Sequence, residues 1–356
     1  MGEHRSRRRS ESSSGALTTL PGFEPPTPVP KELVNVPDGA TVVRVQPDIT
    51  AIVGGFDYFV PPQWGDDGRA AKVALGSMVR VDFAGRRVAG WVTELGVEPT
   101  GTHVVRPLLK VSGYGPPGEV IELADWAAWR WAGKRAHLLR VASPPKMVLG
   151  VAKRSLVRSP VEHLAFGSGS TVARTVPTDD GQAMATAVAE AGGGLILTPS
   201  VEDKRRIVSA LRQGGVDVAS YPEEWSRSAA GVTTVGTRTA AFAPLPDMQA
   251  VLVLDAHDDR YKEERTPAWD AREVVIERAR RSGVPCVFSS PVPTLHLLEA
   301  TDRLLGPSRA QERAGWPNVH VVDLRVAERP GLLTNCLLYT SPSPRDRTRS
   351  RMPSSA

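Results

Sequence analysis

The chain has 356 residues, of which 41% are hydrophobic and 23% are charged, and its formal net charge is +5. This length accommodates two domains or more, and the apolar fraction suits globular cores. With only two cysteines, Cys286 and Cys336, the sequence excludes a disulfide framework and a cysteine zinc site. No apolar run approaches the roughly 18 residues of a membrane helix, so we expect a cytoplasmic protein that does not enter a membrane.

Two terminal segments differ in composition from the rest. Residues 1–39 are rich in Ser, Arg and Pro and predict a disordered, solvated basic arm. Residues 336–356, "CLLYTSPSPRDRTRSRMPSSA", lack apolar periodicity and resemble the translation of a sequencing adapter, so we interpret them as a foreign tail. On this interpretation the natural sequence continues beyond Asn335 and the chain is truncated. Because the tail holds more than half of the net positive charge, that charge alone is weak evidence for nucleic-acid binding.

Residues 40–146 contain short runs in which apolar and polar residues alternate. The runs "TVVRVQ", "FDYFV", "SMVRVDF", "RRVAGWVTEL" and "HVVRPLLKV" are separated by turns that contain Pro or Gly. This alternation predicts strands, so we expect a small β-rich domain. The stretch "PPGEVIELADWAAWRWAGKRAHLL" predicts one helix at the end of this domain. Residues 147–180 have little periodicity and predict a connector.

Residues 181–305 alternate apolar strands with amphipathic helices. Strands are predicted at "GLILTPS", "VDVASY", "VTTVG", "AVLVLDAH" and "PCVFSS", and helices at "GQAMATAVAEAG", "VEDKRRIVSALRQGG" and "AWDAREVVIERARRSG". This pattern is typical of a parallel sheet with helices on both faces. Binding sites in such sheets lie at the carboxyl ends of the strands, where Asp255, His257, Asp258 and Asp259 fall. Residues 306–335 are expected to begin a link to a further domain.

The acidic stretch after "VLVLD" is open to three interpretations. In a nucleotide-hydrolysing lobe Asp255 would hold magnesium and a Glu would usually follow it, but Ala256 follows it in this chain. In a metal hydrolase Asp255, His257 and Asp259 would share a cation, although no paired ligand motif occurs elsewhere. In the third interpretation the segment is a solvated acidic loop after a buried strand.

A phosphate loop, the second device of nucleotide hydrolysis, has no match in the sequence. The pattern G-x-x-x-x-G-K-[ST] does not occur, and the nearest glycine-rich stretch, "AFGSGSTVART" at residues 165–175, lacks its core. Without that lysine and a cradle of backbone N–H groups, the charge of a triphosphate has no preorganised partner. We therefore expect weak or absent ATP hydrolysis, with no catalytic residue, bound cofactor or metal ligand in this chain. The alternative is a nucleotide site at an unrecognised loop, "FGSGST".

Several motifs occur in an order that resembles one family. "FDYFVP" at residues 56–61 and "GSMVRVDFAGRRVAGWV" at residues 76–92 are followed by "LILTPS", by "VGTRTAAFAPLPDMQAVLVLDAHDDRYKEERTPAWDAREVVIERA" and by "SSPVPTL". Together they resemble primosomal protein N-prime, the PriA family of replication-restart helicases, over about residues 42–335, and degenerate actinobacterial members most of all. The resemblance implies a DNA 3′-end-binding domain at residues 40–146 and one degenerate RecA-like helicase lobe at residues 181–305.

The resemblance also implies which residues bind DNA. The family's Phe-Asp-Tyr element, whose Asp contacts the terminal nucleotide, maps onto "FDY", and a basic turn of the family maps onto the paired arginines of "AGRRV". A carboxylate suits a strand end because it accepts hydrogen bonds from a terminal hydroxyl or a base amino group, while aromatic neighbours stack on the base. Arginines would give salt-dependent phosphate contacts, or would simply keep an edge strand solvated. The predicted DNA-binding residues are Phe56, Asp57, Tyr58, Arg80, Arg86 and Arg87.

Departures from the family pattern concern the lobe. The family's acidic box has a glutamate pair where only Ala256 stands, and Val292 replaces the threonine of its Ser-Ala-Thr motif. Its second helicase lobe and its cysteine-rich zinc insertion would lie beyond residue 335, so the second lobe is expected to be missing. The remaining members, interpreted as a vestigial acidic box, are Asp255, His257 and Asp258.

These features predict a DNA-binding protein of replication restart, or primosome assembly. We expect it to recognise branched or forked DNA with a 3′ end and to assemble with primosome proteins. The family uses ATP, Mg and Zn, but we expect the helicase-like lobe of this chain not to hydrolyse ATP. The alternative is an active ATP-dependent 3′–5′ DNA helicase of the same family.

Overall fold

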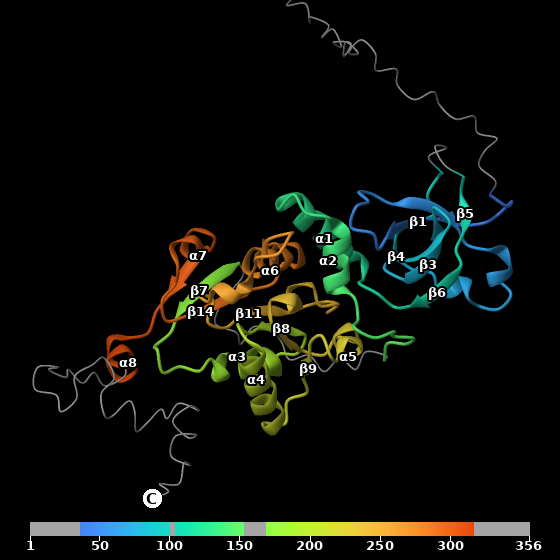
Figure 1. The fold of residues 1–356 in the computed structure, drawn as a ribbon. Helices are drawn as coiled ribbons and strands as arrows, with labels where there is room; N and C mark the ends of the chain where they lie inside the picture. The colour runs from blue at the N-terminus through green and yellow to red at the C-terminus, as the bar shows by residue number, and fades with distance from the viewer. Residues whose placement is uncertain (1–35, 100–103, 153–168, 317–356) are drawn as a thin grey trace, which may run out of the picture.

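The computed structural model describes residues 36–99, 104–152 and 169–316, which form a β-rich N-terminal domain, a helix pair and an α/β lobe (Figure 1). The predicted arm up to residue 35, residues 317–335 and the predicted foreign tail at residues 336–356 lie outside the described residues. Among the residues that are described, no helix is long and apolar enough to cross a membrane.

The N-terminal domain is a six-stranded sheet with the strand order β5-β2-β1-β4-β3-β6. Alternation sets its two faces: Val43 and Val45 of β1 are fully buried, and Arg44 between them lies on the opposite face. Valines of β1, β3 and β4 pack with Tyr58 and Trp64 to form the domain core. The strands are β1 (Val42–Pro47), β2 (Phe56–Phe59), β3 (Met78–Phe83), β4 (Arg86–Leu95), β5 (Arg106–Pro107) and β6 (Lys110–Gly113).

Two helices follow this sheet where the sequence predicts one. The helix α1 (Gly118–Arg130) begins after Pro117, and α2 (Arg135–Ala142) follows a break. The break has a physical cause, because Ala132 has a positive φ of 48° and Gly133 lies against Pro267, where a Cβ on the glycine would be 2.5 Å from the proline Cβ. The apolar stripe continues through the break, so periodicity alone could not reveal it.

The α/β lobe is a seven-stranded sheet in which the pairings are parallel, with the order β15-β7-β14-β11-β8-β10-β9. The first strand of the lobe along the chain, β7, lies inside the sheet, and later strands pair on both sides of it. Helices cover both faces of the sheet. Helices α3 and α4 pack on one face, and α6 with the α1–α2 pair packs on the other (Figure 1). The predicted β-rich domain followed by a parallel α/β region is confirmed.

The elements of the lobe have the following bounds. The parallel strands are β7 (Ser170–Arg174), β8 (Gly194–Leu197), β9 (Ala219–Ser220), β10 (Thr234–Gly236), β11 (Ala250–Val253), β14 (Cys286–Ser290) and β15 (Arg303–Leu305). A short antiparallel pair consists of β12 (Lys262–Glu263) and β13 (Trp269–Asp270). The helices are α3 (Gln182–Glu190), α4 (Val201–Gln213), α5 (Trp225–Ala229), α6 (Ala271–Ser282), α7 (Leu295–Glu299) and α8 (Arg309–Ala314).

The strand β7 lies within residues 147–180, where the sequence predicts a connector, and for this stretch that prediction is wrong. Half of the strand is polar: Ser170 and Thr171 are buried, and Ser170 donates its hydroxyl to Asp302 at 2.9 Å. The strand forms because β14 and β15 pair with it on either side. Such long-range pairing leaves no local pattern in the sequence.

The α1–α2 pair connects the two sheets. Buried residues of both helices belong to the same apolar core as α6 and one face of the lobe sheet, and Trp91 of β4 joins that core. The indole N–H of Trp91 donates to Ser143 at 2.8 Å, and that of Trp225 donates to the Ala142 carbonyl at 2.8 Å. The domain and the lobe are therefore joined through a continuous core.

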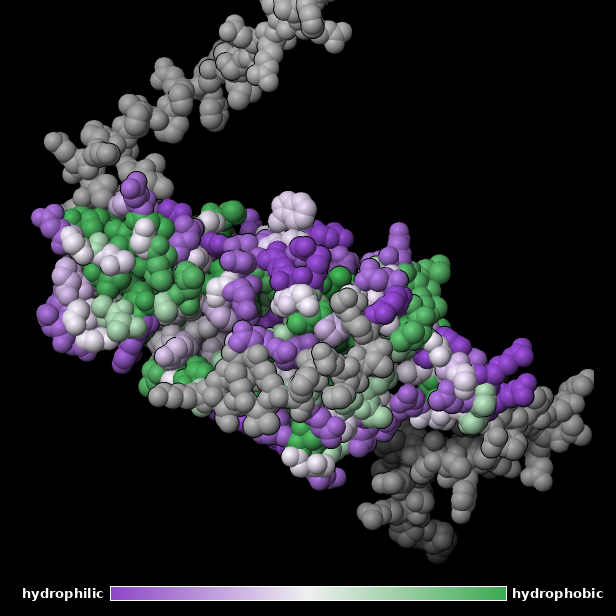
Figure 2. All heavy atoms as spheres, turned by 180° about the vertical axis from the view of Figure 1, so that it is seen from behind, coloured by the Kyte–Doolittle hydropathy of each residue, from purple (hydrophilic) through white to green (hydrophobic). Residues whose placement is uncertain are grey.

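On the face seen in Figure 2, apolar residues gather over the N-terminal domain with hydrophilic residues around them.

Candidate nucleic-acid interface

A hollow of about 790 Å³ opens beside β2 in the N-terminal domain, and we name it the Asp57 pocket. Valine and phenylalanine side chains form the apolar part of its lining, which includes Val53, Phe56, Phe83 and Val104. The charged part combines both signs. It consists of Arg44, Arg106, Arg135, Asp57, Asp82 and Glu94.

Strand register places Arg44 between two carboxylates. Arg44 of β1 stands opposite Asp57 of β2 on one side and opposite Glu94 of β4 on the other. Arg44 Nε donates to Asp57 Oδ1 at 2.9 Å, and Arg44 Nη1 donates to Glu94 Oε2 at 3.0 Å. The Asp57 side chain is 8% exposed, and its hydrogen bond raises the pKa of the Arg44 guanidinium. The pocket wall thus holds a carboxylate beside a permanent positive charge.

The two aromatic residues predicted to bind DNA both lie on the face opposite Asp57, as period-two geometry predicts. That face packs on the domain core. Tyr58 is 4% exposed and donates its hydroxyl to the Asp82 carbonyl at 3.0 Å, and burial raises its pKa to about 12. Phe56 is half-buried and contacts Phe83 edge to face, with 5.0 Å between the ring centroids. The Tyr58 ring packs in the core and also lines the Asp57 pocket, so its contact with DNA stays a prediction.

Three arginines of the pocket are missing from the sequence prediction. Arg106 forms an ion pair with Asp82 at 2.8 Å, and Arg135 reaches the pocket from the start of α2. Both come from segments far from Asp57 along the chain, so only the fold brings them together. Arg44 had a local signal, since a charged residue between two buried valines of a strand must face away from the core.

The predicted phosphate-contacting arginines lie outside the Asp57 pocket. Arg80, Arg86 and Arg87 are exposed on β3 and β4. Arg86 stands opposite Phe83, which lines the pocket, whereas Arg80 and Arg87 line a different hollow on the same sheet. The predicted DNA-binding residues therefore do not form one site, and Arg86 lines neither hollow.

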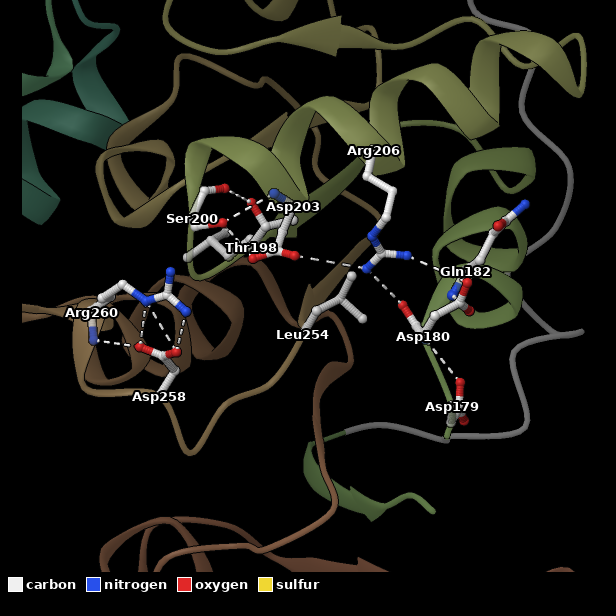
Figure 3. Close-up of polar contacts among 12 residues, drawn as sticks. Asp179, Asp180, Gln182, Thr198, Ser200, Asp203, Arg206, Leu254, Asp258 and Arg260 are labelled. Carbon is white, nitrogen blue, oxygen red and sulfur yellow. Dashed lines mark hydrogen bonds and ion pairs between the residues drawn. The ribbon is translucent and has the colours of Figure 1, made fainter. Parts of the chain in front are cut away.

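A second candidate site surrounds the loop that joins β7 to α3, at the carboxyl edge of the lobe sheet (Figure 3). Residues 175–181, "TVPTDDG", form this loop, and they pack on the end of β11, since a Cβ at Gly181 would lie 2.5 Å from Leu254 Cδ2. A strand–loop–helix unit beside a strand that ends in Asp255 is where a nucleotide-hydrolysing lobe carries its phosphate loop. No glycine–lysine pattern marks this position, so a sequence motif could not identify it.

Two backbone N–H groups at the end of this loop donate hydrogen bonds to aspartate side chains of the same loop. Asp179 accepts a hydrogen bond from the Gly181 N–H at 2.8 Å, and Asp180 accepts one from the Gln182 N–H at 3.0 Å. Arg206 of α4 donates to the carboxylate and the carbonyl of Asp180, at 3.4 and 3.2 Å (Figure 3). Two of the amides that could bind phosphate where α3 begins, those of Gly181 and Gln182, are therefore used by side chains of the same loop.

The three residues of the predicted acidic box lie in the segment that follows β11. Burial raises the pKa of the half-buried Asp255 carboxyl, whose backbone has a positive φ of 47°. The His257 Nδ1 atom lies 3.1 Å from Ser290 Oγ at the end of β14. Asp258 accepts a hydrogen bond from the Arg260 guanidinium at 2.6 Å, and this contact lowers the pKa of its carboxyl. The His257 and Asp258 side chains are thus directed to different neighbours.

Two other interpretations of the lobe find no support in the structure. In the described part of the chain, no three His, Cys, Asp or Glu side chains come together as a metal site, and Asp259 lies in the 3-10 turn Asp259–Tyr261. The stretch "FGSGST" leads into β7 from its amino end, and its last two residues already belong to that strand. Its described part therefore lies at the edge of the sheet opposite to the carboxyl ends. Residues 166–168 of the stretch are outside the described residues.

The charges of the β7–α3 loop differ from those of a phosphate loop. The loop of residues 175–181 contains no Lys or Arg. Its aspartates would repel phosphates, and the Gly181 and Gln182 amides are already bonded to them. The charged side chains labelled in Figure 3 are Asp179, Asp180, Asp203 and Asp258 against Arg206 and Arg260.

The N-terminal domain matches a known family. Residues 43–144 match the PriA 3′DNA-binding domain (3′BD). This range contains the six strands of the sheet from Val43 onward, the α1–α2 pair and the charged residues of the Asp57 pocket. The family match therefore covers the site that the geometry singles out.

Longer similarity extends to whole proteins named for replication restart. The probable replication restart protein PriA of Mycobacterium tuberculosis (strain CDC 1551 / Oshkosh) is 30% identical over 317 residues, which is 77% of this chain and 45% of that protein. The Mycobacterium leprae (strain TN) protein is 29% identical over 269 residues, 63% of this chain and 40% of that protein. The replication restart protein PriA of Bacillus subtilis (strain 168) is 25% identical over 166 residues, 42% of this chain and 21% of that protein.

The chain spans less than half the length of each of these relatives. Its similarity to the mycobacterial proteins nevertheless covers most of the chain. The predicted resemblance is confirmed: the chain is a relative of the PriA replication restart proteins, and its residues 43–144 match their 3′ DNA-binding domain.

Proposed function

We propose that this chain belongs to a replication-restart protein that captures a 3′ DNA end at branched or forked DNA, and that its helicase-like lobe does not hydrolyse ATP. The Asp57 pocket carries this proposal, because it lies inside the residues that match the 3′ DNA-binding domain. The match supports DNA binding, and the geometry of the pocket supports the role of each side chain.

The pocket offers the groups that a strand terminus requires. A terminal 3′ hydroxyl donates a hydrogen bond, and the carboxylate of Asp57 accepts one. An internal nucleotide has no donor at this oxygen, and an added 3′ phosphate would be repelled by the carboxylate. The pocket arginines contribute positive charge for the last phosphates, and the Phe56–Phe83 pair forms an apolar wall for the sugar or the base.

The lobe supports the proposal through the chemistry of its loop. The amides next to Asp179 and Asp180 are bonded to these side chains, so a triphosphate would have to displace two internal hydrogen bonds and approach like charge. The core shared through the α1–α2 pair connects the lobe to the N-terminal domain. We infer that the lobe serves as a platform for DNA or for primosome proteins.

Substitution of Asp57 tests whether this carboxylate binds the terminal 3′ hydroxyl. We expect Asp57→Ala to weaken binding to duplexes with an open 3′ hydroxyl by about 10- to 100-fold, the range for a lost hydrogen bond to a charged group. Binding to the same duplex with a 3′ phosphate should not weaken and should become somewhat stronger, because the substitution removes the repulsion between the carboxylate and the phosphate. Fluorescence anisotropy with the two labelled duplexes measures both affinities on the full chain.

A matched control separates this role from a general change in charge. Asp66→Ala removes an exposed carboxylate of the same domain outside the Asp57 pocket and should affect both duplexes alike. In Asp57→Ala, Arg44 keeps its contact with Glu94 and so retains one of its two ion pairs. Equal losses on open and blocked ends would contradict the assigned role of Asp57.

A further inference from the structure

A second hollow, of about 610 Å³, lies on the N-terminal domain between β3, β4, β6 and the segment that follows α2, and we name it the basic groove. Its charged lining residues are Arg80, Arg87, Lys110 and Lys146, and no carboxylate is part of its lining. The basic groove and the Asp57 pocket have no lining residue in common. One region of the domain thus mixes both signs of charge, while the other carries a single sign.

The cations of the basic groove have no carboxylate partner in the described part of the chain. Arg80 stands directly opposite Lys110 across the β3–β6 pair, and like charges at such positions destabilise a sheet. The carboxylate opposite Arg87 is that of Asp82, which is instead bound to Arg106 at 2.8 Å. Repelling charges without an internal partner favour an anionic ligand.

The far wall of the basic groove is fixed to the sheet. The Tyr114 N–H donates to the Val148 carbonyl at 2.8 Å, and a Cβ at Gly113 would lie 2.4 Å from the same oxygen. This close approach positions Lys146 and the Tyr114 side chain, which is 49% exposed, along the groove. An exposed aromatic ring among cations is the combination that binds single-stranded nucleic acid, since cations contact phosphates and the ring stacks on a base.

We propose that the basic groove binds the phosphate backbone of single-stranded DNA at internal nucleotides, independently of the terminus held in the Asp57 pocket. This proposal rests on the proposed DNA-binding function and adds a second contact that recognises charge and not an end. A 3′ hydroxyl gains nothing in the basic groove, because no carboxylate lines it. One sheet would then hold a strand end and a continuous strand of a fork at separate places.

Circular single-stranded DNA separates the two sites, because it has phosphates but no terminus. We expect Arg80→Ala/Lys110→Ala to weaken binding of such a circle by about tenfold at low salt. The slope of log K against log salt should fall by roughly 1.4, about 0.7 for each lost contact with single-stranded DNA. Asp57→Ala should leave the affinity for the circle unchanged.

A matched double variant controls for the change in net charge. Arg69→Ala/Lys72→Ala removes one Arg and one Lys from exposed positions of the same domain outside both hollows. This variant should keep the salt slope within about half of one contact of the unsubstituted chain. In addition, Tyr114→Ala should weaken binding of the circle by at least about fivefold, whereas Tyr114→Phe should not. Thermal denaturation verifies that each variant remains folded.

The outcomes distinguish this proposal from the proposed function. If Arg80→Ala/Lys110→Ala loses no more affinity for the circle than Arg69→Ala/Lys72→Ala, the basic groove does not bind DNA, even where Asp57→Ala confirms the terminus pocket. The groove would then suit another anion, such as an acidic peptide. If the unsubstituted chain binds neither the open-ended duplex nor the circle, the proposed function itself is wrong.

Discussion

The Asp57 pocket and the β7–α3 loop both place aspartates beside positive charge, but they use them differently. In the pocket, Arg44 binds Asp57 and Glu94 at the wall of a hollow of about 790 Å³, so these charges border a space that a ligand can enter. In the loop, Asp179 and Asp180 accept the backbone N–H groups beside them, at 2.8 and 3.0 Å. Aspartate therefore indicates a binding site only where the fold leaves a space next to it, not where its own loop satisfies it.

The largest expected effect tests whether polar groups at the lobe edge are structural. Arg272 is 4% exposed, donates to Asp270 at 2.9 and 2.7 Å, and donates to the Ala256 carbonyl at 2.7 Å. We expect Arg272→Ala to lower the free energy of unfolding by about 3–5 kcal/mol, because the buried Asp270 carboxylate loses its partner. Chemical denaturation of the full chain measures the loss.

An exposed arginine of the same region is the control for that measurement. Arg265→Ala should change the free energy of unfolding by less than about 0.5 kcal/mol, because Arg265 is exposed. A loss equally small in Arg272→Ala would mean that water already reaches the end of β11. The lobe edge would then resemble the Asp57 pocket more closely than its hydrogen bonds indicate.

The comparison also explains which parts of the fold could be predicted from the sequence. Strands such as β8 and β11 consist of consecutive apolar residues. This local pattern predicts a buried strand even when the strands that pair with it are not known. The strand β7 is short and half polar, and it depends on pairing with β14 and β15, which no local pattern encodes. The break between α1 and α2 likewise depends on contact with Pro267, far along the chain.

The two candidate sites differ in the same way. Asp57 was identified through the resemblance of a short motif, but Arg106 and Arg135 join it only through the folded sheet and the start of α2. At the β7–α3 loop no motif remains to be read, and topology alone identifies the position. A site can therefore be predicted from the sequence where a motif remains, as at Asp57, but not where its position depends on topology alone, as at the β7–α3 loop.

A smaller effect is expected at Gly181, which measures how firmly the β7–α3 loop packs on β11. This glycine has a positive φ of 71°, and a Cβ there would lie 2.5 Å from Leu254 Cδ2. We expect Gly181→Ala to lower the free energy of unfolding by about 2–4 kcal/mol, from backbone strain together with crowding. Gly215→Ala is the control, because Gly215 has a φ of 81° with nothing within 4 Å, so its cost should be about 1–2 kcal/mol of strain. Equal costs would show that the loop is loosely seated and can rearrange around a ligand.

The smallest expected effect separates the two regions most directly, because Mg-ATP should leave the stability of the chain unchanged. A ligand that binds the native state raises stability by RT ln(1 + [L]/Kd), so about 1 mM ATP with a Kd of about 10 µM would add about 2.7 kcal/mol. The Gly181 and Gln182 amides are bonded to Asp179 and Asp180, so we expect less than about 0.4 kcal/mol at that concentration, which gives no resolved change in Tm. A single-stranded DNA with an open 3′ end, which the Asp57 pocket is proposed to bind, should raise Tm in the same assay.

Variants decide the meaning of any rise in Tm that Mg-ATP does cause. Asp255→Asn removes the carboxylate at the end of β11 and keeps a residue type that tolerates its positive φ of 47°. A rise that is lost in Asp255→Asn would place a nucleotide at the lobe edge and remove the contrast between loop and pocket. A rise that persists in Asp255→Asn and in Asp179→Asn/Asp180→Asn would place the nucleotide elsewhere. The loop would then not be a nucleotide site, in agreement with its internal hydrogen bonds.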